Sequence, residues 1–480
     1  MRRLFLSIFL IQALPSFAQD VSKDTKLGAE AAVQVELEMG LYDHDSLYKL
    51  VNEVGTKLVS RLSKNQFDFQ FFLVDSAEPN AFALPGGYVY VTRGILPLVQ
   101  TEDELAGIMA HEIIHVTERH SIKQMKKGVV SSILKVPGNI INAVTGTQLG
   151  NVLNAPINFS EKAFIAQYSQ KHEKDADLFG IQLAASAGYQ TDALANALET
   201  LSEEVEVLTG EKEKQNYFSD HPYTPTRVTS IRSAASRYAP VSSAPVASSN
   251  EIFLNKFEGL VFGHNPQQGV FRDTLFLHPD LRLAWIIPSK WTAVNQPNVV
   301  AAYSEKGDGM VSMRLAGSGQ SLDEMLATIR EKIKENEKAG KIKIDFMGDT
   351  VINRLPSHLF RIKSRESNNE VLMNLALVPY RDVVLQFVGV STSKLGKLMS
   401  HSLTSFREAR DEEVASLDIY RISLIAAKGG ETLGSISSRA ENKLNNEMTA
   451  IINKLSPDEK LKEGEVVKVV KASPYLSSLR

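Results

Sequence analysis

Two histidines and a glutamate in the stretch TEDELAGIMAHEIIHVTERH, residues 101–120, have the types and spacing needed for metal chemistry. On a helix, His111 and His115 lie one turn apart on the same face, so both imidazoles can reach one ion. Glu112 lies close enough to hold a metal-bound water but is displaced from the ligand positions. This HExxH pattern predicts a zinc site for peptide hydrolysis, with Glu112 as the base.

The alternative is a structural helix with two hydrogen-bonded histidines, and a third ligand separates these hypotheses. Because the chain contains no cysteine, that ligand must be His, Asp or Glu. A second helical stretch, residues 160–187, places Glu173 and Asp177 on one face. Glu173 can supply the carboxylate, and Asp177 can hydrogen-bond a ligating histidine. Small residues on the same side would allow close approach of the two helices: Ser169, Gly180 and Ala184.

The helix that carries HExxH has a clear start signal. Thr101 and Glu104 form a predicted capping box, and apolar residues follow at helical spacing. His120 faces the opposite side from His111 and is predicted not to bind the metal. The sequence does not settle the role of His172, which precedes Glu173.

These motifs resemble a known family. HExxH followed by Glu173-x-x-x-Asp177 within HEKDADLFG is similar to the zinc metalloendopeptidase family that includes HtpX and the CAAX prenyl endopeptidase. The likeness is closer to the soluble periplasmic BepA-like branch, and it covers residues 27–237. It extends to three further stretches: LGAEAAVQVELEMGLYDHDSLYKLVNEVGTKLV, NAFALPGGYVYVTRGIL and HPYTPTR.

The resemblance implies one Zn²⁺ per chain, held by three side chains: His111, His115 and Glu173. Glu112 would be the general base, and Asp177 would orient a ligand or donate a proton. His221 and Arg227 would lie near the open coordination position, stabilising the oxyanion or occupying the fourth site in a resting state. Alternatively, His221 belongs to an ordinary turn at the start of a helix and Arg227 is a surface arginine, with no role at the metal.

Two further segments are candidates for holding or admitting a substrate. The alternation in GGYVYVT, residues 86–92, predicts a strand. Either it is an exposed edge that binds an extended polypeptide, as the resemblance favours, or it is an interior strand whose tyrosines pack. The edge hypothesis assigns substrate binding to five residues: Gly86, Gly87, Tyr88, Val89 and Tyr90. Residues 128–160 are apolar and nearly uncharged. They are predicted to be a lid over the site, a surface that contacts a membrane or an unfolded protein, or a segment of the core.

Length and composition predict a globular α+β protein of several domains. The chain has 480 residues, 43% of them hydrophobic, and a net charge of -3 that gives no attraction to nucleic acid. The predicted order is a signal peptide (1–18), a mostly helical zincin-like metallopeptidase domain with a small sheet (19–238), a linker (239–252), an α+β domain of unknown role (253–412) and a LysM-like βααβ module (413–480).

The two ends of the chain suggest where it works. Met1–Arg3 is basic, residues 4–14 are apolar and small residues precede a cleavage position at Ala18, which predicts export to the periplasm. An uncleaved anchor is the alternative. The C-terminal module resembles LysM through Gly430–Leu433 and Leu461–Gly464, so it either contacts peptidoglycan or is a packing domain without a ligand.

Three functions fit these patterns. The first is a secreted zinc endopeptidase acting on misfolded or stalled envelope proteins. The second is a periplasmic chaperone or outer-membrane assembly factor with a latent protease site. The third is a cell-wall-associated protein tethered by its LysM-like end. Expected partners are polypeptides, with peptidoglycan, the outer-membrane assembly machinery and peripheral membrane contact left open; nucleic acid is not expected.

Overall fold

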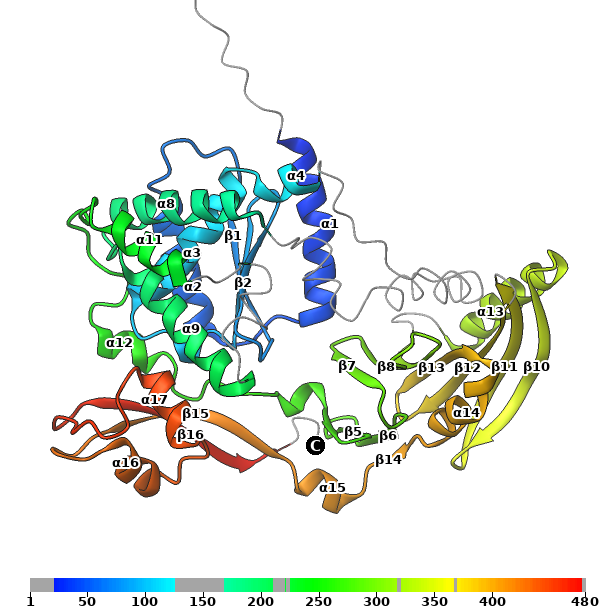
Figure 1. Ribbon diagram of the computed structural model, residues 1–480. Coiled ribbons are helices and arrows are strands. Elements are labelled where there is room, and N and C mark those ends of the chain that lie inside the picture. Colours follow the sequence, from blue (N-terminus) through cyan, green and yellow to red (C-terminus); the bar gives the residue numbers. More distant parts are fainter. Residues whose placement is uncertain are drawn as a thin grey trace, which may run out of the picture.

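The computed structural model describes residues 21–125, 168–209, 221, 225–316, 321–366 and 369–476. The predicted signal peptide and the predicted lid at residues 128–160 lie outside these ranges. The described part is α+β, as the sequence predicts: a mainly helical body and a large antiparallel sheet lie at opposite ends of the molecule (Figure 1). Within these ranges, no helix combines the length and the hydropathy needed to cross a bilayer.

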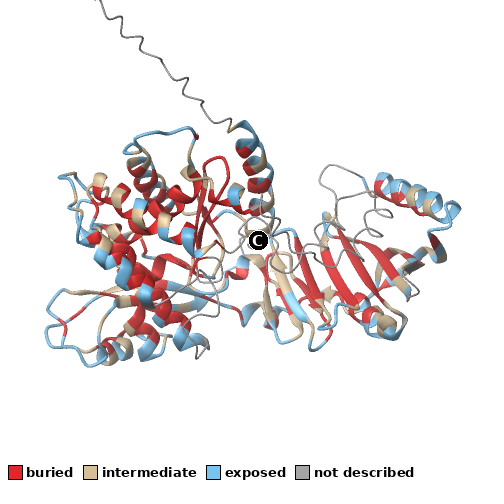
Figure 2. Cartoon of the chain, turned by 45° about the horizontal axis from the view of Figure 1, so that its top comes forward, coloured by how far each residue is buried: buried red, intermediate tan, exposed pale blue. Residues whose placement is uncertain are grey.

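The helical body surrounds one central helix. Its helices are α1 (Ser22–Met39), α2 (Asp45–Val59), α3 (Glu102–Thr117), α4 (His120–Met125), α8 (Gln170–Ser186), α9 (Ala193–Thr209), α11 (Pro225–Ala235) and α12 (Asn250–Asn255), with the 3-10 turn η1 (Leu96–Leu98) before α3. Nearly every side chain of α3 is buried, because α2, α8, α9 and the small sheet pack around it. Helix α3 is therefore enclosed by these elements, within a body whose interior residues are buried (Figure 2).

The start of α3 follows the predicted cap closely. The Thr101 side chain accepts a hydrogen bond from Glu104 N at 3.2 Å, and α3 begins at the next residue, Glu102. The Glu104 carboxylate accepts from Gln100 N at 2.6 Å, one residue before the cap. The acidic first turn also complements the helix dipole.

The small sheet corrects the prediction of a free edge at residues 86–90. Its order is β1 (Gln70–Val74), β3 (Tyr88–Thr92), β2 (Ala81–Leu84), so β3 pairs on both sides and offers no edge to a substrate. Tyr90 is fully buried and stacks on Phe72 and Phe82. Gly86 and Gly87 have φ of +88° and +111°, and a Cβ on either would lie within 2.7 Å of Thr25 or Asp68 backbone. The turn itself requires both glycines, without any ligand.

The large sheet has seven strands in the order β10-β11-β12-β13-β9-β8-β7, all antiparallel. They are β7 (Thr292–Gln296), β8 (Val299–Tyr303), β9 (Gly309–Leu315), β10 (Ile342–Ile352), β11 (Leu355–Glu366), β12 (Asn369–Tyr380) and β13 (Val383–Thr392). Helices α13 (Leu322–Lys338) and α14 (Gly396–Thr404), the latter after η3 (Ser393–Leu395), pack on opposite faces, because alternate strand residues contribute to two separate cores.

A second, four-stranded sheet has the order β14-β6-β5-β4. Its strands are β4 (Val270–Arg272), β5 (Leu275–His278), β6 (Leu283–Ile286) and β14 (Arg407–Glu408), accompanied by η2 (Pro266–Gln268) and α15 (Asp411–Ala415).

The C-terminal module has the predicted order of strand, helix, helix, strand. These are β15 (Asp418–Ala426), α16 (Leu433–Ala440), α17 (Asn446–Asn453) and β16 (Val466–Pro474), with β15 and β16 paired along their whole length. Ile422, Ile452 and Val470 of the module belong to the same core as the helical body. Lys468 is buried there and donates to Pro97 O at 2.7 Å and Val99 O at 3.0 Å. We call this contact of η1 and α9 with the module the C-terminal junction.

The segment predicted as a linker, residues 239–252, also contacts the helical body. Glu102 accepts hydrogen bonds from Val246 N at 2.7 Å and Ala247 N at 2.5 Å, and Ala247 is buried. Helix α12 begins within the segment, at Asn250, after Ser249 caps it. The proline- and serine-rich segment has little regular structure, but the Glu102 carboxylate binds its backbone and holds it against the helical body.

Candidate metal centre

Helices α3 and α8 supply the centre of the site and approach each other closely. A Cβ on Gly180 of α8 would lie 3.2 Å from the backbone nitrogen of His111, so the glycine permits the contact. Helix α8 begins after Ser169, whose side chain accepts a hydrogen bond from His172 N. Of the predicted small residues on this face, Gly180 therefore allows the close approach of the two helices, and Ser169 caps α8.

Four buried side chains converge: two from α3, one from α8 and one from the segment before α11. They are His111, His115, Glu173 and His221, and one potential ligand atom of each lies within 4.8 Å of all the others. His111 Nε2 is 2.9 Å from His115 Nε2 and 3.2 Å from His221 Nδ1. The Glu173 carboxylate lies 3.4 Å from His115 Nε2, 3.5 Å from His111 Nε2 and 3.2 Å from His221 Nδ1.

These separations fit a single small cation. Nitrogen and oxygen ligands at 2.0–2.1 Å from a tetrahedral zinc would lie about 3.3 Å from one another. The observed separations of 2.9 to 3.5 Å bracket that length. Three imidazoles and one carboxylate, with no thiolate, also suit a divalent metal. The cluster can therefore bind one metal ion.

Asp177 and Arg227 brace the cluster from behind. Asp177 Oδ1 lies 3.0 Å from His111 Nδ1, and Arg227 holds the same carboxylate through Nε at 2.9 Å and Nη2 at 2.8 Å. Arg227 Nη1 also reaches Glu173 Oε2 at 3.0 Å and donates to His221 O at 3.3 Å. Arg227 is only 7% exposed, so the alternative of a surface arginine is wrong.

Comparison with known proteins identifies the region that carries this geometry. Residues 46–235 match the model of peptidase family M48. These residues form a peptidase M48 domain. The beta-barrel assembly-enhancing protease of Escherichia coli is 28% identical over 264 residues, covering 51% of this chain and 53% of that protein. The protein of the same name in Yersinia pestis is 29% identical over 258 residues, covering 50% and 51%.

A eukaryotic protein is also similar to this chain. The mitochondrial metalloendopeptidase OMA1 of Schizosaccharomyces pombe is 30% identical over 221 residues, covering 44% of this chain and 61% of that protein. This chain thus spans about half the length of the curated relatives it matches.

Burial and charge act in opposite directions on the acidic groups of the M48 domain. Burial raises the pKa of Glu112, whose Oε1 lies 3.5 Å from His221 Nε2. Burial also opposes ionisation of Asp177, but the Arg227 charge and His111 hold its pKa below the usual value. His221 and Arg227 outweigh burial at Glu173 in the same way and hold its pKa well down. The carboxylates of Asp177 and Glu173 are thus kept ionised, whereas Glu112 is biased toward its neutral form.

The two histidines of α3 respond differently: burial and the nearby His111 lower the pKa of His115 well below its usual value, whereas the carboxylates act mainly on His111. Burial alone would lower the pKa of His111, but hydrogen bonds to Asp177 and Glu173 raise it to about 9. The carboxylates therefore attract positive charge to the position where the cluster can hold a cation.

His120 is not one of the four clustered residues, but it does not continue the helix of His111, contrary to the prediction: α3 ends at Thr117, α4 begins at His120, and the His120 ring contacts His115. His120 Nδ1 is 3.1 Å from His115 Nδ1, and its ring stacks on His172 with centroids 4.4 Å apart. Tyr168 stacks on the other side of His115 with centroids 3.8 Å apart. The sequence did not single out Tyr168, because it precedes α8 without any motif; its hydroxyl meets Ser121 Oγ at 2.8 Å.

Proposed function

We propose that this chain is a zinc-dependent metalloendopeptidase that cleaves misfolded or stalled envelope proteins in the periplasm. The observation that carries the proposal is the buried cluster of His111, His115 and Glu173 with Glu112 beside it. The names of the relatives support peptidase chemistry, and two of them support a role beside β-barrel assembly.

Each residue has a role that its contacts support. His111, His115 and Glu173 would hold the zinc, which when bound polarises water and the substrate carbonyl. Glu112 accepts the proton of the attacking water and returns it to the leaving amine, and its raised pKa suits a group that must both take and give a proton. Asp177 and Arg227 fix the orientation of His111 and Glu173.

His221 is best explained as a fourth ligand in a resting state. Its Nδ1 lies within the ligand cluster, and a site with four protein ligands is closed to substrate. Hydrolysis then requires His221 to leave the cluster. The peptidase is therefore latent until a substrate displaces His221. This arrangement also favours the second candidate function, an outer-membrane assembly factor or chaperone whose protease site is rarely open.

Replacing Glu112 tests the proposed chemistry. The Glu112→Gln variant keeps the size of the side chain but cannot accept a proton, so hydrolysis of unfolded protein should fall about 10²–10⁴-fold. Bound zinc, measured by elemental analysis, should be unchanged. Cleavage is followed with unfolded β-barrel protein and with casein as a generic unfolded substrate.

Two variants frame this test. Glu118→Gln, near the end of the same helix and half-exposed, should leave hydrolysis unchanged. His221→Ala should raise hydrolysis, because it removes the fourth ligand. Full hydrolysis by Glu112→Gln would rule out the proposed base. An intact cellular phenotype in Glu112→Gln, together with lost hydrolysis, would favour the assembly factor.

A further inference from the structure

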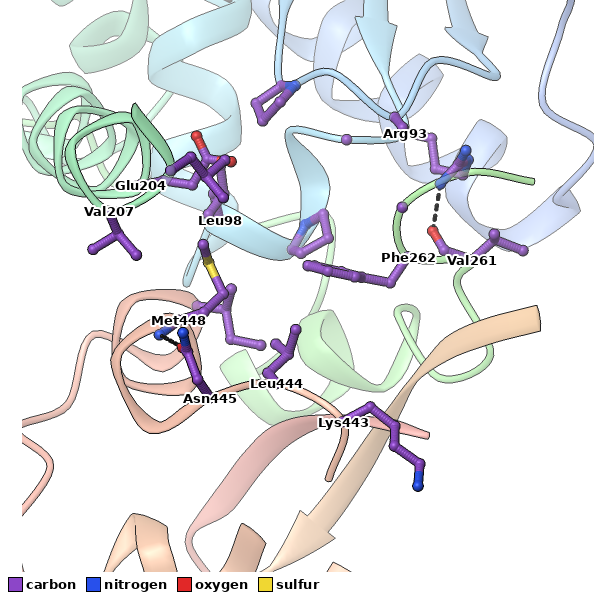
Figure 3. Close-up of a pocket in the computed structure, with 17 residues that line it drawn as sticks. Arg93, Leu98, Glu204, Val207, Val261, Phe262, Lys443, Leu444, Asn445 and Met448 are labelled. Atoms are coloured by element: carbon purple, nitrogen blue, oxygen red, sulfur yellow. Dashed lines mark hydrogen bonds between the residues drawn. The ribbon is translucent and has the colours of Figure 1, made fainter. Parts of the chain in front are cut away.

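A cavity of about 430 Å³ lies at the C-terminal junction (Figure 3), and no residue of the metal cluster lines it. Its walls come from η1, α9, the segment after α12 and α17, and most of them are apolar: Leu98, Val207, Phe262, Leu444, Met448 and Ile452. This volume falls within the range typical of small-ligand pockets. Its position makes any occupant a bridge between the M48 domain and the C-terminal module.

One carboxylate faces this cavity. Glu204 of α9 is 7% exposed, and in the described part of the chain no hydrogen bond reaches its Oε2. Burial raises the pKa of Glu204 to about 7. A buried carboxylate without a partner is costly to ionise, so a cation brought into the cavity would recover that cost.

The two basic residues that line the cavity do not pair with Glu204. Arg93 binds Asp75 through Nε at 2.7 Å and Val261 O through Nη1. Lys443 is exposed, and its side chain points away from Glu204 in Figure 3. Burial is the cause of the Glu204 shift, with neither base offsetting it. Neither base therefore neutralises the Glu204 carboxylate.

We propose that this cavity binds an ammonium group on an aliphatic stem, with Glu204 as its counter-ion. The stem contacts the apolar walls around Met448 and Leu98, and the ammonium pairs with the carboxylate. Lysine side chains at protein surfaces likewise bury their aliphatic stem and keep the charged group in a polar environment. Both a lysine side chain of a polypeptide and a free alkylamine have this chemistry. The site is separate from the metal cluster and does not rest on the proposed peptidase function.

Calorimetry on the full chain tests this site with hexylamine as the probe and 1-hexanol as its neutral analogue. Hexylamine should bind at least about tenfold more tightly than hexanol, because only the amine pairs with the carboxylate. Glu204→Gln keeps the shape of the side chain and should abolish that preference. Glu203→Gln, an exposed neighbour on the same helix, is the matched control and should bind as the unmodified protein does.

A second variant tests the cavity without touching its charge. Met448→Trp fills the space and should weaken hexylamine binding about tenfold while the melting temperature confirms folding. A blocked peptide with one lysine between two leucines identifies the source: tighter binding than hexylamine assigns the site to polypeptides, and weaker binding assigns it to free amines. No binding of hexylamine or peptide, equal binding of hexanol, or unchanged hexylamine binding by Glu204→Gln would overturn the proposal.

Discussion

The metal centre and the C-terminal junction both bury ionisable groups, but they differ in how those groups are paired. At the metal centre, Asp177 and Glu173 meet Arg227 and His111 within about hydrogen-bond distance, and both acids keep low pKa values. At the junction, burial lowers the pKa of Lys468 to about 7 and raises that of Glu204 to about 7. Burial opposes ionisation in both regions. The acids of the metal centre stay ionised, whereas Glu204 and Lys468 of the junction tend toward their neutral forms.

This contrast shows that partners, more than burial, decide whether a buried group stays ionised. A closed network of opposite charges compensates its own desolvation. Lys468 donates hydrogen bonds to two carbonyl oxygens, and the Glu104 charge offsets only part of the effect of its burial, whereas Glu204 lines a cavity. The first region holds its charges in fixed positions, and the second would change its charge near neutral pH.

The largest effect should come from breaking the paired network. Arg227→Met leaves Asp177 and Glu173 buried without their cation, so the unfolding free energy of the metal-free protein should fall by about 3–5 kcal/mol. Urea unfolding in the presence of a chelator measures this. Arg232→Met, on the same helix and paired with Glu199 at the surface, should cost less than about 1 kcal/mol. Equal losses in both variants would show that the network is not compensated as described.

The second effect concerns Lys468, whose pKa in the folded protein is lowered. The folded state binds fewer protons than the unfolded state between about pH 7 and pH 10.5, so stability rises with pH in that window. Lys468→Met removes this term. The unfolding free energy of the unmodified protein should rise relative to the variant by about 3 kcal/mol from about pH 6.5 to pH 9.5. Thermal unfolding across pH measures it, and parallel pH profiles would contradict the prediction.

Glu204 should show the opposite pH dependence, with a smaller effect. Its folded pKa is raised, so the folded state binds more protons between about pH 4.5 and pH 7, and stability falls as pH rises through that window. Glu204→Gln removes this loss. The unfolding free energy of the variant should therefore rise by about 2 kcal/mol relative to the unmodified protein as the pH increases from about 5 to about 7.5. Glu203→Gln should follow the unmodified protein. A Glu204→Gln variant that loses stability at neutral pH would show that the carboxylate is paired after all.

The smallest effect is expected at the outer contact of the metal centre. His120→Gln removes the ring that meets His115 Nδ1, so the orientation of His115 is less well held and zinc affinity should fall about tenfold. Competition with a chromophoric chelator measures the affinity. His264→Gln, an exposed histidine outside the M48 domain, should have no effect. Unchanged affinity in His120→Gln would show that His115 is held by Tyr168 alone.

Local patterns in the sequence determined the elements that carry the site. The i, i+4 spacing placed His111 and His115 on one face, and Thr101 marked the start of their helix. The same spacing put Glu173 and Asp177 on one face of the second helix. The strand–helix–helix–strand order of the C-terminal module was also readable. Each of these depends on residues close together in the chain, where spacing alone defines a face.

Tertiary structure alone decided the remaining features, because they depend on contacts between distant segments. Alternation predicted a strand at residues 88–92 but could not show that β3 pairs on both sides, since pairing depends on β1 and β2. The resemblance left the role of His221 open, and only the packing of three segments brought its Nδ1 to the cluster: α3, α8 and the residues before α11. Charged residues are mostly exposed in proteins, and nothing in the sequence around Glu204 and Lys468 indicates burial. They are buried because the C-terminal module packs on the M48 domain, a contact between segments more than two hundred residues apart.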